Sequence, residues 1–215
     1  MTALVGYKGQ VLVTSSPSVS ASNLALTDAG DHATFNASTS ATQRYWDKTQ
    51  AANFVVQTST NGGTSWSIAS PTLYTISRYV NGQVLFAPAL AVGTTARMQT
   101  YYYFAYSVLV DAHSWELSLD ASLIDVTTFN TAGWKTYLPV PKSANGKIDR
   151  FWIDGAFQAI MGNLMVIILY IDSTALNRYE MYGYIKADQV KDAVEQVITE
   201  ALTFDADSQC YFMTT

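Results

Sequence analysis

The sequence predicts a mainly β protein, and three observations support this fold class. Segments of alternating polar and apolar residues recur along the chain, which is the pattern of strands with one buried face. Turn-forming pairs such as Asn-Gly separate several of these segments, as β-hairpins require. Only 13% of the 215 residues are charged and 49% are hydrophobic, against about 25% charged in average globular proteins. Such a chain can bury a substantial core, in one large domain or two small ones.

The first part of the chain contains one short strand, two hairpins and an aromatic strand. Hairpins are expected where strand-forming residues flank Asn-Gly turns. We therefore expect residues 1–98 to form a sandwich-like, β-rich region and residues 99–215 to form a second β domain, with no Pro/Gly linker between them. The expected elements are a strand at Val11–Val13, a hairpin of Phe54–Thr58 with Trp66–Ile68, a hairpin of Tyr74–Ile76 with Gln83–Phe86, and the aromatic strand within Thr94–Tyr106.

The densest strand signals lie between Ser114 and Trp152. Trp115, Leu117 and Leu119 alternate with polar residues, which predicts a half-buried strand. β-branched residues predict another strand over 124–129, and a third is expected over 147–152 after an Asn145-Gly146 turn. A long aromatic loop therefore separates two strands of one sheet.

The order of residues in this stretch resembles the signature region of the tail tube proteins (major tail proteins) of long-tailed bacteriophages. In that family a W-x-L-x-L strand precedes a D-x-T-T-F segment, a loop with G-W and an L-P step. Val140 and Pro141 stand where the family usually has a second glycine and leucine. The matching residues are Trp115, Leu117, Leu119, Asp125, Thr127, Thr128, Phe129, Gly133, Trp134, Leu138, Pro139, Lys142 and Gly146.

This resemblance implies a tail-tube-type β-sandwich or barrel of two packed antiparallel sheets with one short helix, to which the N-terminal β-rich region is added. It implies a structural virion protein without enzymatic activity or cofactors, whose subunits form hexameric rings that stack into the conduit for DNA ejection. The expected partners are copies of the chain itself, a tape measure protein and tail terminator or tip proteins. DNA would pass through without sequence-specific binding, and no membrane partner is expected. The expected location is the phage tail, assembled in the cytoplasm of the bacterial host. A head–tail adaptor or tail terminator of the same fold is the nearest alternative.

The resemblance also nominates residues for assembly. The loop of residues 130–145 would be an arm by which one subunit grips the next, with Trp134 and Tyr137 as its apolar anchors. The assembly candidates are Trp115, Asp125, Thr127, Thr128, Phe129, Trp134 and Tyr137.

The acidic residues are concentrated in the second half of the chain. Residues 1–100 hold three acids and five bases, a net charge of +2, whereas the remainder holds fourteen acids and seven bases, a net charge of −7. A negative wall repels phosphates, so we hypothesise that acidic side chains of this half line the lumen of the tube. The lumen candidates are Asp149, Asp154, Glu180 and Glu200.

Other function classes have less support. A carbohydrate-binding surface module would use Trp66 and the aromatic residues Tyr101–Tyr103, although such residues more often belong to a core or an interface. Ser59–Trp66 looks like the Asp-box turn of propeller proteins, with Asn61 in place of the aspartate, and a glycine-rich hairpin turn explains it better. His32 and His113 have no triad or metal-ligand pattern around them. We therefore expect no catalytic, metal or cofactor site.

The remaining signals concern the cell compartment and buried strands. Cys210 is the single cysteine, so no disulfide framework or cysteine metal site is expected. The N-terminal residues lack a secretory signal pattern, which predicts synthesis in a reducing cytoplasm. The apolar run Leu164–Ile171 is too short for a membrane helix, which needs about 20 residues, and predicts a fully buried strand.

Local pattern and resemblance disagree near the C-terminus. Apolar residues in Ala187–Leu202 recur with helical spacing, which favours an amphipathic helix. Arg178-Tyr179-Glu180 and Tyr184, in contrast, resemble the strand that precedes the last long strand of tail tube proteins. We adopt a strand for Gln196–Phe204, preceded by a turn or a short helix.

Overall fold

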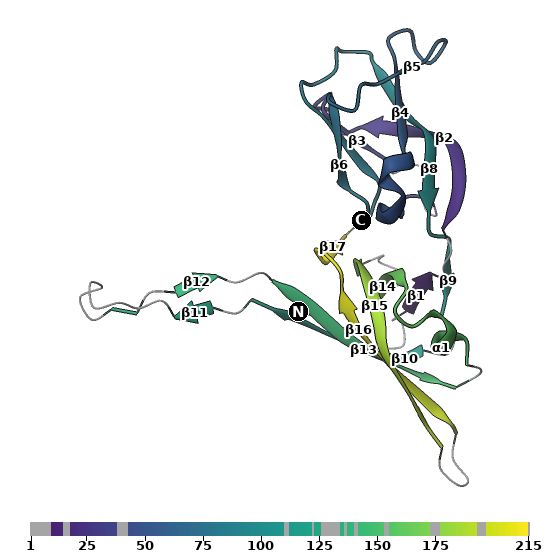
Figure 1. The fold of residues 1–215 in the computed structure, drawn as a ribbon, viewed down its shortest axis with the longest axis vertical. Coiled ribbons are helices and arrows are strands. Elements are labelled where there is room, and N and C mark those ends of the chain that lie inside the picture. The colour runs from purple at the N-terminus through teal and green to yellow at the C-terminus, as the bar shows by residue number, and fades with distance from the viewer. Residues whose placement is uncertain are drawn as a thin grey trace. The chain divides into compact units, whose positions relative to one another are not determined.

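A computed structural model describes residues 10–14, 18–37, 43–109, 112–121, 123–125, 134–135, 137–139, 142–152, 155–172, 177–192 and 197–214. The chain divides into two compact units, one of residues 14–107 and one of residues 1–13 and 108–215. Each unit contains a large antiparallel sheet, and the described residues include one short α-helix, α1 (Ala156–Ile160) (Figure 1). The predicted mainly β fold class, with a short helix, is confirmed.

The unit of residues 14–107 is built on a seven-stranded sheet in the order β5-β4-β8-β2-β3-β7-β6. Its core centres on Trp46, which is fully buried and meets Phe54 edge to face with ring centroids 5.9 Å apart. Phe35 and Phe86 form a second edge-to-face pair in the same core. The elements are β2 (Val19–Asp28), β3 (Thr34–Asn36), the 3-10 helix η2 (Lys48–Asn53), β4 (Val55–Ser59), β5 (Ser67–Ile68), β6 (Tyr74–Arg78), β7 (Gln83–Phe86) and β8 (Thr95–Tyr103).

Both predicted hairpins of this unit are confirmed, since β4 pairs with β5 and β6 pairs with β7. The second turn needs its glycine for two reasons. Asn81 and Gly82 both have positive φ, which glycine adopts without strain. A Cβ on Gly82 would also lie within 3 Å of the Cβ of Ala37 and of the Trp46 ring. The turn therefore closes directly over the core.

The second unit is built on an eight-stranded sheet in the order β10-β13-β16-β15-β14-β1-β9, with β17 also pairing with β15. A separate two-stranded sheet pairs β11 with β12. The elements are β1 (Gln10–Thr14), β9 (Tyr106–Val108), β10 (Ala112–Asp120), β11 (Leu123–Asp125), β12 (Tyr137–Pro139), β13 (Ser143–Phe151), β14 (Leu164–Asp172), β15 (Asn177–Lys191), β16 (Thr199–Ala206) and β17 (Tyr211–Met213).

The core of this unit lies against one face of the β13, β16, β15 and β14 strands. Ile148, Leu202 and Phe204 are fully buried there, and Phe157 from α1 covers them. In β14 every residue from Met165 to Leu169 is at most 1% exposed, so both of its faces are covered. The prediction of a fully buried strand is therefore confirmed for Met165–Leu169, while Leu164, Tyr170 and Ile171 at its ends are half-buried.

The N-terminal strand belongs to the unit that contains the C-terminus. Leu12 of β1 lies opposite Ile168 of β14, and the division between the units falls near residue 107. The expected boundary between residues 98 and 99 differs from this division, because it would cut β8, which pairs with both β2 and β4. Strand pairing between residues so far apart in sequence cannot be predicted from local sequence patterns.

Two local predictions are wrong. Ala187–Lys191 continues β15 instead of forming a helix, because this segment pairs with β16 from Ala187 opposite Thr203 to Lys191 opposite Thr199. The strand prediction holds for Thr199–Phe204, which lies within β16, while residues 193–196 lie outside the described residues. Asn145-Gly146 is not a turn but part of β13, where Gly146 lies between Leu117 and Phe204 on the neighbouring strands.

Candidate assembly surfaces

The two-stranded sheet of β11 and β12, here called the ribbon, connects the ends of β10 and β13 (Figure 1). Ile124 lies opposite Leu138 and Asp125 lies opposite Tyr137. Among the described residues, neither strand pairs with any other strand. A two-stranded hairpin alone is at best marginally stable in water, so the ribbon needs packing from elsewhere.

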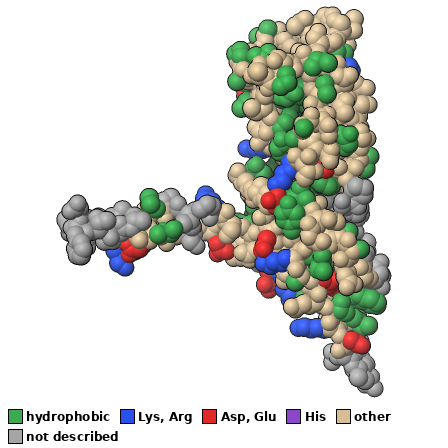
Figure 2. Space-filling view, in the orientation of Figure 1, with side chains coloured by type: hydrophobic (Ala, Val, Ile, Leu, Met, Phe, Trp, Pro, Cys, Tyr) green, Lys and Arg blue, Asp and Glu red, His purple; other side chains and the backbone are tan. Residues whose placement is uncertain are grey.

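The ribbon exposes large apolar side chains on both faces. Leu123 and Ile124 are neighbours in a strand, so they point to opposite faces, and they are 60% and 54% exposed. Leu138 and Tyr137 on β12 are also exposed, and Trp134 is 80% exposed. Figure 2 shows hydrophobic side chains on the surface of the ribbon. A surface of this kind marks a site of protein association.

β10 is a second candidate surface because it forms the end of the eight-stranded sheet. It pairs with β13 along nearly its whole length, and the described residues supply no strand on its other side. Free N–H and C=O groups on an edge strand favour pairing with a strand of another chain. Such an edge permits a sheet to continue from one copy of the chain into the next.

Trp115 on β10 has a structural role. Its side chain packs against the core, its indole Nε1 donates a hydrogen bond to the Tyr170 carbonyl at 3.3 Å, and its ring meets Tyr179 edge to face. It therefore holds β10 against its own sheet, and its side chain is half-buried.

The other assembly candidates lie on or near the ribbon. Asp125 is exposed on β11, and Tyr137 and Trp134 are exposed as described above. Thr127, Thr128 and Phe129 lie outside the described residues. Leu123 and Ile124 were not predicted as assembly residues from the sequence, whereas Leu138 lies within the predicted arm but was not one of its named anchors. The available signal was the adjacent pair Leu123-Ile124, which cannot bury both side chains on one face of a strand.

The face of the sheet opposite the core is largely polar and carries two ion pairs. Asp149 forms an ion pair with Lys147 at 2.6 Å and accepts a hydrogen bond from Ser114 at 3.1 Å. Partial burial acts to raise the pKa of Asp149, but these two partners bring it below the ordinary value. Lys186 and Asp205 form a second, exposed pair at 2.7 Å. This face is therefore polar without a strong excess of negative charge.

Two of the four predicted lumen residues are wrong because they are buried. Glu180 is 0% exposed and pairs with Arg178 at 2.5 Å, while Glu200 is 1% exposed and pairs with Arg150. Burial, offset by Arg150 and reinforced by Asp188, raises the pKa of Glu200. Neither carboxylate reaches a surface. Of the other two candidates, Asp149 lies on the polar face and Asp154 lies outside the described residues.

The alternative carbohydrate surface loses part of its predicted platform. Tyr101 is 1% exposed and lies in the core, where its hydroxyl donates to the Gln43 side chain at 3.0 Å. Tyr102 and Tyr103 are half-buried and pack against the same core. Trp66 is half-buried beneath the Arg97 guanidinium, which lies 4.3 Å from its ring centroid.

The Asp-box-like turn is held by Asn61. Its Oδ1 accepts hydrogen bonds from the Ser65 amide at 3.0 Å and the Ser59 hydroxyl at 2.8 Å. These bonds are those of an ordinary turn capped by an asparagine. In the described part of the chain, no group of three or more His, Cys, Asp or Glu side chains is placed to hold a metal ion. The helices described there include none with the length and apolarity needed to cross a membrane.

Comparison with known proteins gives weak structural likeness only. No protein-family model matches the sequence, and no curated protein matches it significantly. A chain of the virion of a native gene transfer agent particle matches with a TM-score of 0.43 and 15% identity, over 51% of this chain and 89% of that chain. A chain from the tail of an empty gene transfer agent particle with C6 symmetry matches with a TM-score of 0.42 and 15% identity, over 51% and 87%. TM-scores of this size do not transfer a fold or a role to this chain.

Proposed function

We propose that this chain is a tail tube subunit of a long-tailed bacteriophage, which assembles with copies of itself into stacked rings that form the conduit for DNA. The observation that carries this proposal is the ribbon, because it exposes apolar residues on both faces and pairs with no other described strand of its own chain. A soluble monomer rarely keeps such a surface uncovered. Covering it with another subunit removes the apolar area from water and also orders the hairpin.

The open edge at β10 supports ring formation. If a strand of a neighbouring copy pairs with β10, the sheet continues around a closed ring and the free edge disappears. Closed cyclic symmetry is the usual arrangement of homo-oligomers. The ribbon then serves contacts between rings, and β10 serves contacts within a ring. The ordered matches to tail tube proteins from Trp115 to Gly146 support the same role.

The polar face of β10 and β13 is our proposed lumen wall. It is the face opposite the core, and it carries Glu116, Lys147 and Asp149. Hydrated, paired charges offer phosphates no strong binding site, so DNA can pass without adhering. In this arrangement the wall repels the phosphates of DNA only weakly, because the positive charge of Lys147 offsets the negative charge of Asp149.

Assembly itself tests the proposal. Purified protein viewed by negative-stain electron microscopy should form tubes of stacked rings. Trp134→Ala should leave thermal unfolding unchanged, since the side chain is 80% exposed and surface substitutions change stability by only about 0.5 kcal/mol. It should nevertheless reduce tube length and number. Ile68→Ala, at a side chain 68% exposed in the other unit, is the matched control. Dispersed monomers of the unaltered protein at all concentrations would rule out a tube subunit.

The location of the lumen can be tested separately. Glu116→Cys in a Cys210→Ser background should react with a bulky maleimide-polyethylene glycol in monomers and should be protected in tubes. The same label at Ile68→Cys should react in both states if that residue faces outward. Equal labelling of the Glu116→Cys variant in monomers and tubes would remove this face from the lumen.

Single rings in place of tubes would favour a head–tail adaptor or tail terminator. The ribbon contact distinguishes these roles. A tube subunit uses it to bind the next ring of the same protein, whereas an adaptor contacts a different protein on at least one side of its ring. In that case, Trp134→Ala would leave the rings intact.

A further inference from the structure

A cavity of about 800 Å³ opens in the second unit where β10 and β13 approach the ribbon. We call it the socket, and define it by Leu119, Asp120, Ala121, Lys142, Ala144 and Cys210. Leu119 and Ala144 lie opposite each other on the two strands, and Cys210 approaches from the segment before β17. The socket therefore lies between the end of one hairpin and the C-terminal segment.

The socket is an uncovered extension of the core. Trp115, Leu117 and Leu119 alternate along β10 toward the core face, and the first two pack against the core. Leu119 follows in the same row but is 57% exposed. Ala144 forms a buried floor at 7% exposure, and Cys210 packs against the core cluster. The apolar row thus continues beyond the described side chains that cover it.

Resting on the proposed function, we propose that the socket receives Trp134 from the ribbon of a second copy of this chain. An aromatic side chain buries about 150–250 Å², and a cavity of this volume falls within the range of about 300–1,000 Å³ typical of pockets that enclose a ligand. Trp134 is the most exposed aromatic side chain described, at 80%. The socket offers an apolar floor, and the ribbon offers an unburied apolar side chain.

The socket carries one acidic and one basic side chain, Asp120 and Lys142, and Asp120 is the group complementary to the lysine beside Trp134. Lys135 follows Trp134 and is exposed, and Asp120 lies at the rim of the socket. The described contacts of Asp120 are long hydrogen bonds of 3.4 Å from Ser118 and Asn145, so its carboxylate can accept a lysine ammonium. An exposed pair of this kind adds little affinity, but it orients the tryptophan that enters beside it.

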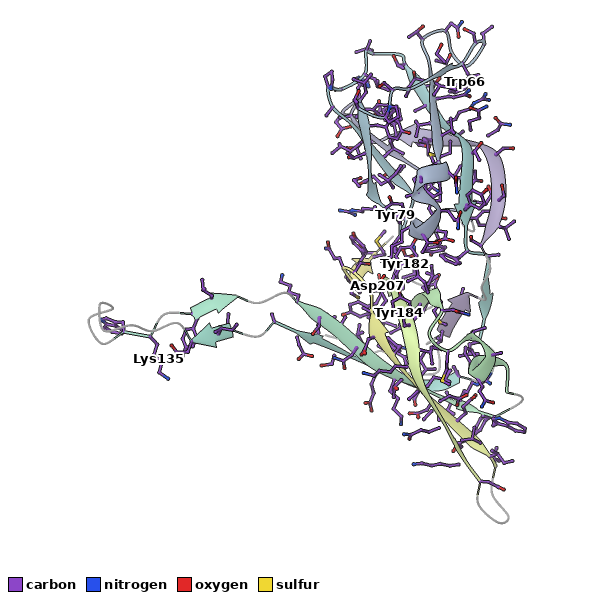
Figure 3. All side chains as sticks on the ribbon, viewed as in Figure 1. Trp66, Tyr79, Lys135, Tyr182, Tyr184 and Asp207 are labelled. Carbon is purple, nitrogen blue, oxygen red and sulfur yellow. The ribbon has the colours of Figure 1, made fainter. Side chains whose placement is uncertain are left out.

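The same chain cannot readily supply its own Trp134. The ribbon runs from Leu123 opposite Pro139, the end next to the socket residues Ala121 and Lys142, to Asp125 opposite Tyr137. Trp134 comes three residues before Tyr137, past that second end. Figure 3 shows Lys135 on the ribbon, away from the side chains of the eight-stranded sheet. The occupant therefore comes from another copy.

The contact joins two different surfaces of the same protein. Each copy presents one ribbon and one socket, so each can bind a partner at both ends. Such head-to-tail contacts propagate from copy to copy instead of stopping at a dimer. This is the geometry needed between successive rings of a tube.

The single cysteine makes the contact testable by cross-linking. Lys135→Cys places a thiol beside Trp134, which stays in place to enter the socket, while Cys210 remains in the socket. Oxidation with copper phenanthroline of assembled protein should give a ladder of covalent multimers on a non-reducing gel, lost on reduction. The ladder should exceed that of Ile68→Cys by at least several-fold, and Cys210→Ser should abolish it.

Three other outcomes overturn the inference. Tubes that form without a ladder would leave the tube function in place and refute the socket. A product of monomer mass with an internal disulfide would mean that the ribbon folds back on its own chain. Failure of the unaltered protein to assemble at all would remove both the tube function and this contact.

Filling the socket provides an independent test. Ala121 is exposed at its rim, so Ala121→Trp should occupy the cavity and shorten or abolish tubes, with little change in unfolding temperature. Ser208→Ala, at the same rim but without added volume, should assemble normally. Tubes formed equally well by Ala121→Trp would contradict the docking of Trp134 there. If Ala121→Trp fails to fold, the cross-linking result decides.

Discussion

Arg150 on β13 and Glu200 on β16 lie directly opposite each other and form an ion pair in the interior of the second unit. Arg150 is 3% exposed and Glu200 is 1% exposed. The Arg150 guanidinium also lies 4.6 Å from the ring centroid of Phe157 on α1. The pair therefore connects the sheet to the helix that covers it, and it is one of two buried ion pairs described in this unit, the other being Arg178–Glu180.

Removing one member of this pair should be costly. Arg150→Met leaves the Glu200 carboxylate buried without its partner, which should lower the free energy of unfolding by about 3–5 kcal/mol. The double variant Arg150→Met/Glu200→Leu removes both charges and should recover most of this loss. Urea unfolding measures both. Lys186→Met, in the exposed pair with Asp205, is the control and should cost less than about 1 kcal/mol. Equal losses for Arg150→Met and Lys186→Met would show that burial of the pair is unimportant.

The turn between β2 and β3 should make stability fall in acid. Hydrogen bonds from the amide and hydroxyl of Thr34 and the amide of Ala33 lower the pKa of Asp31. Since the folded pKa lies below the ordinary value of 3.8, this stabilisation is fully present above about pH 4 and is lost as the pH falls through the folded pKa.

We expect Asp31→Asn to reduce the melting temperature at pH 6 and to flatten its decrease between pH 4 and pH 2. Asp192→Asn, at an exposed position just after β15, is the matched control and should give a curve parallel to that of the unaltered protein. Parallel curves for Asp31→Asn and the unaltered protein would contradict the assignment.

Gly146 should not tolerate a side chain. A Cβ there would lie 2.5 Å from the Phe204 ring and still closer to the carbonyl oxygen of Glu116. Backbone on one side and a core aromatic on the other prevent easy relaxation, so Gly146→Ala should cost about 1–3 kcal/mol. Gly155→Ala is the matched control, because its nearest neighbour would be the Gln158 side chain at 3.9 Å. Chemical denaturation compares the two, and similar stabilities would mean that β10 shifts freely on β13.

Cys210 should react slowly with alkylating reagents. Burial raises the pKa of its thiol from 9.0 to about 11, and only the thiolate is nucleophilic. At pH 8 the thiolate fraction is therefore lower by about 100-fold than for an accessible cysteine of ordinary pKa. Iodoacetamide labelling followed by mass spectrometry gives the rate, with Ile68→Cys/Cys210→Ser as the exposed comparison. The rate should increase about tenfold per pH unit up to the pKa, and rapid labelling at pH 8 would mean that the socket is more open than described.

Local sequence signals predicted the elements that local interactions form. The hairpins around Asn61-Gly62-Gly63 and Asn81-Gly82 are present because turn residues and adjacent strands specify them together. The apolar run in β14 predicted a buried strand because a short, continuous run of apolar residues suits a strand with both faces covered. The helical spacing in Ala187–Lys191 was misleading, because pairing with β16 outweighs a weak helical preference.

The candidate surfaces were predicted only in part. Trp134 and Tyr137 were recognised as arm residues from the sequence, and both are exposed on or beside the ribbon. Glu180 and Glu200 looked like surface carboxylates. Arg150 is 50 residues from Glu200 in sequence, and although Arg178 is close to Glu180 on the same strand, nothing in the sequence shows that this pair is buried. The socket was invisible for the same reason, since Leu119, Ala144 and Cys210 come from three separate segments.

By itself, the sequence determined that this is a mainly β chain, where its short-range hairpins turn, and that an aromatic arm interrupts two strands of one sheet. These properties depend on side-chain alternation and turn chemistry, which act over a few residues. The tertiary structure alone decided that β1 joins the sheet of the C-terminal unit, that two glutamates are interior, and that the apolar row of β10 ends in an open socket. Each of these depends on residues distant in sequence coming together, and the free energy that joins them comes from burial and pairing across the whole unit.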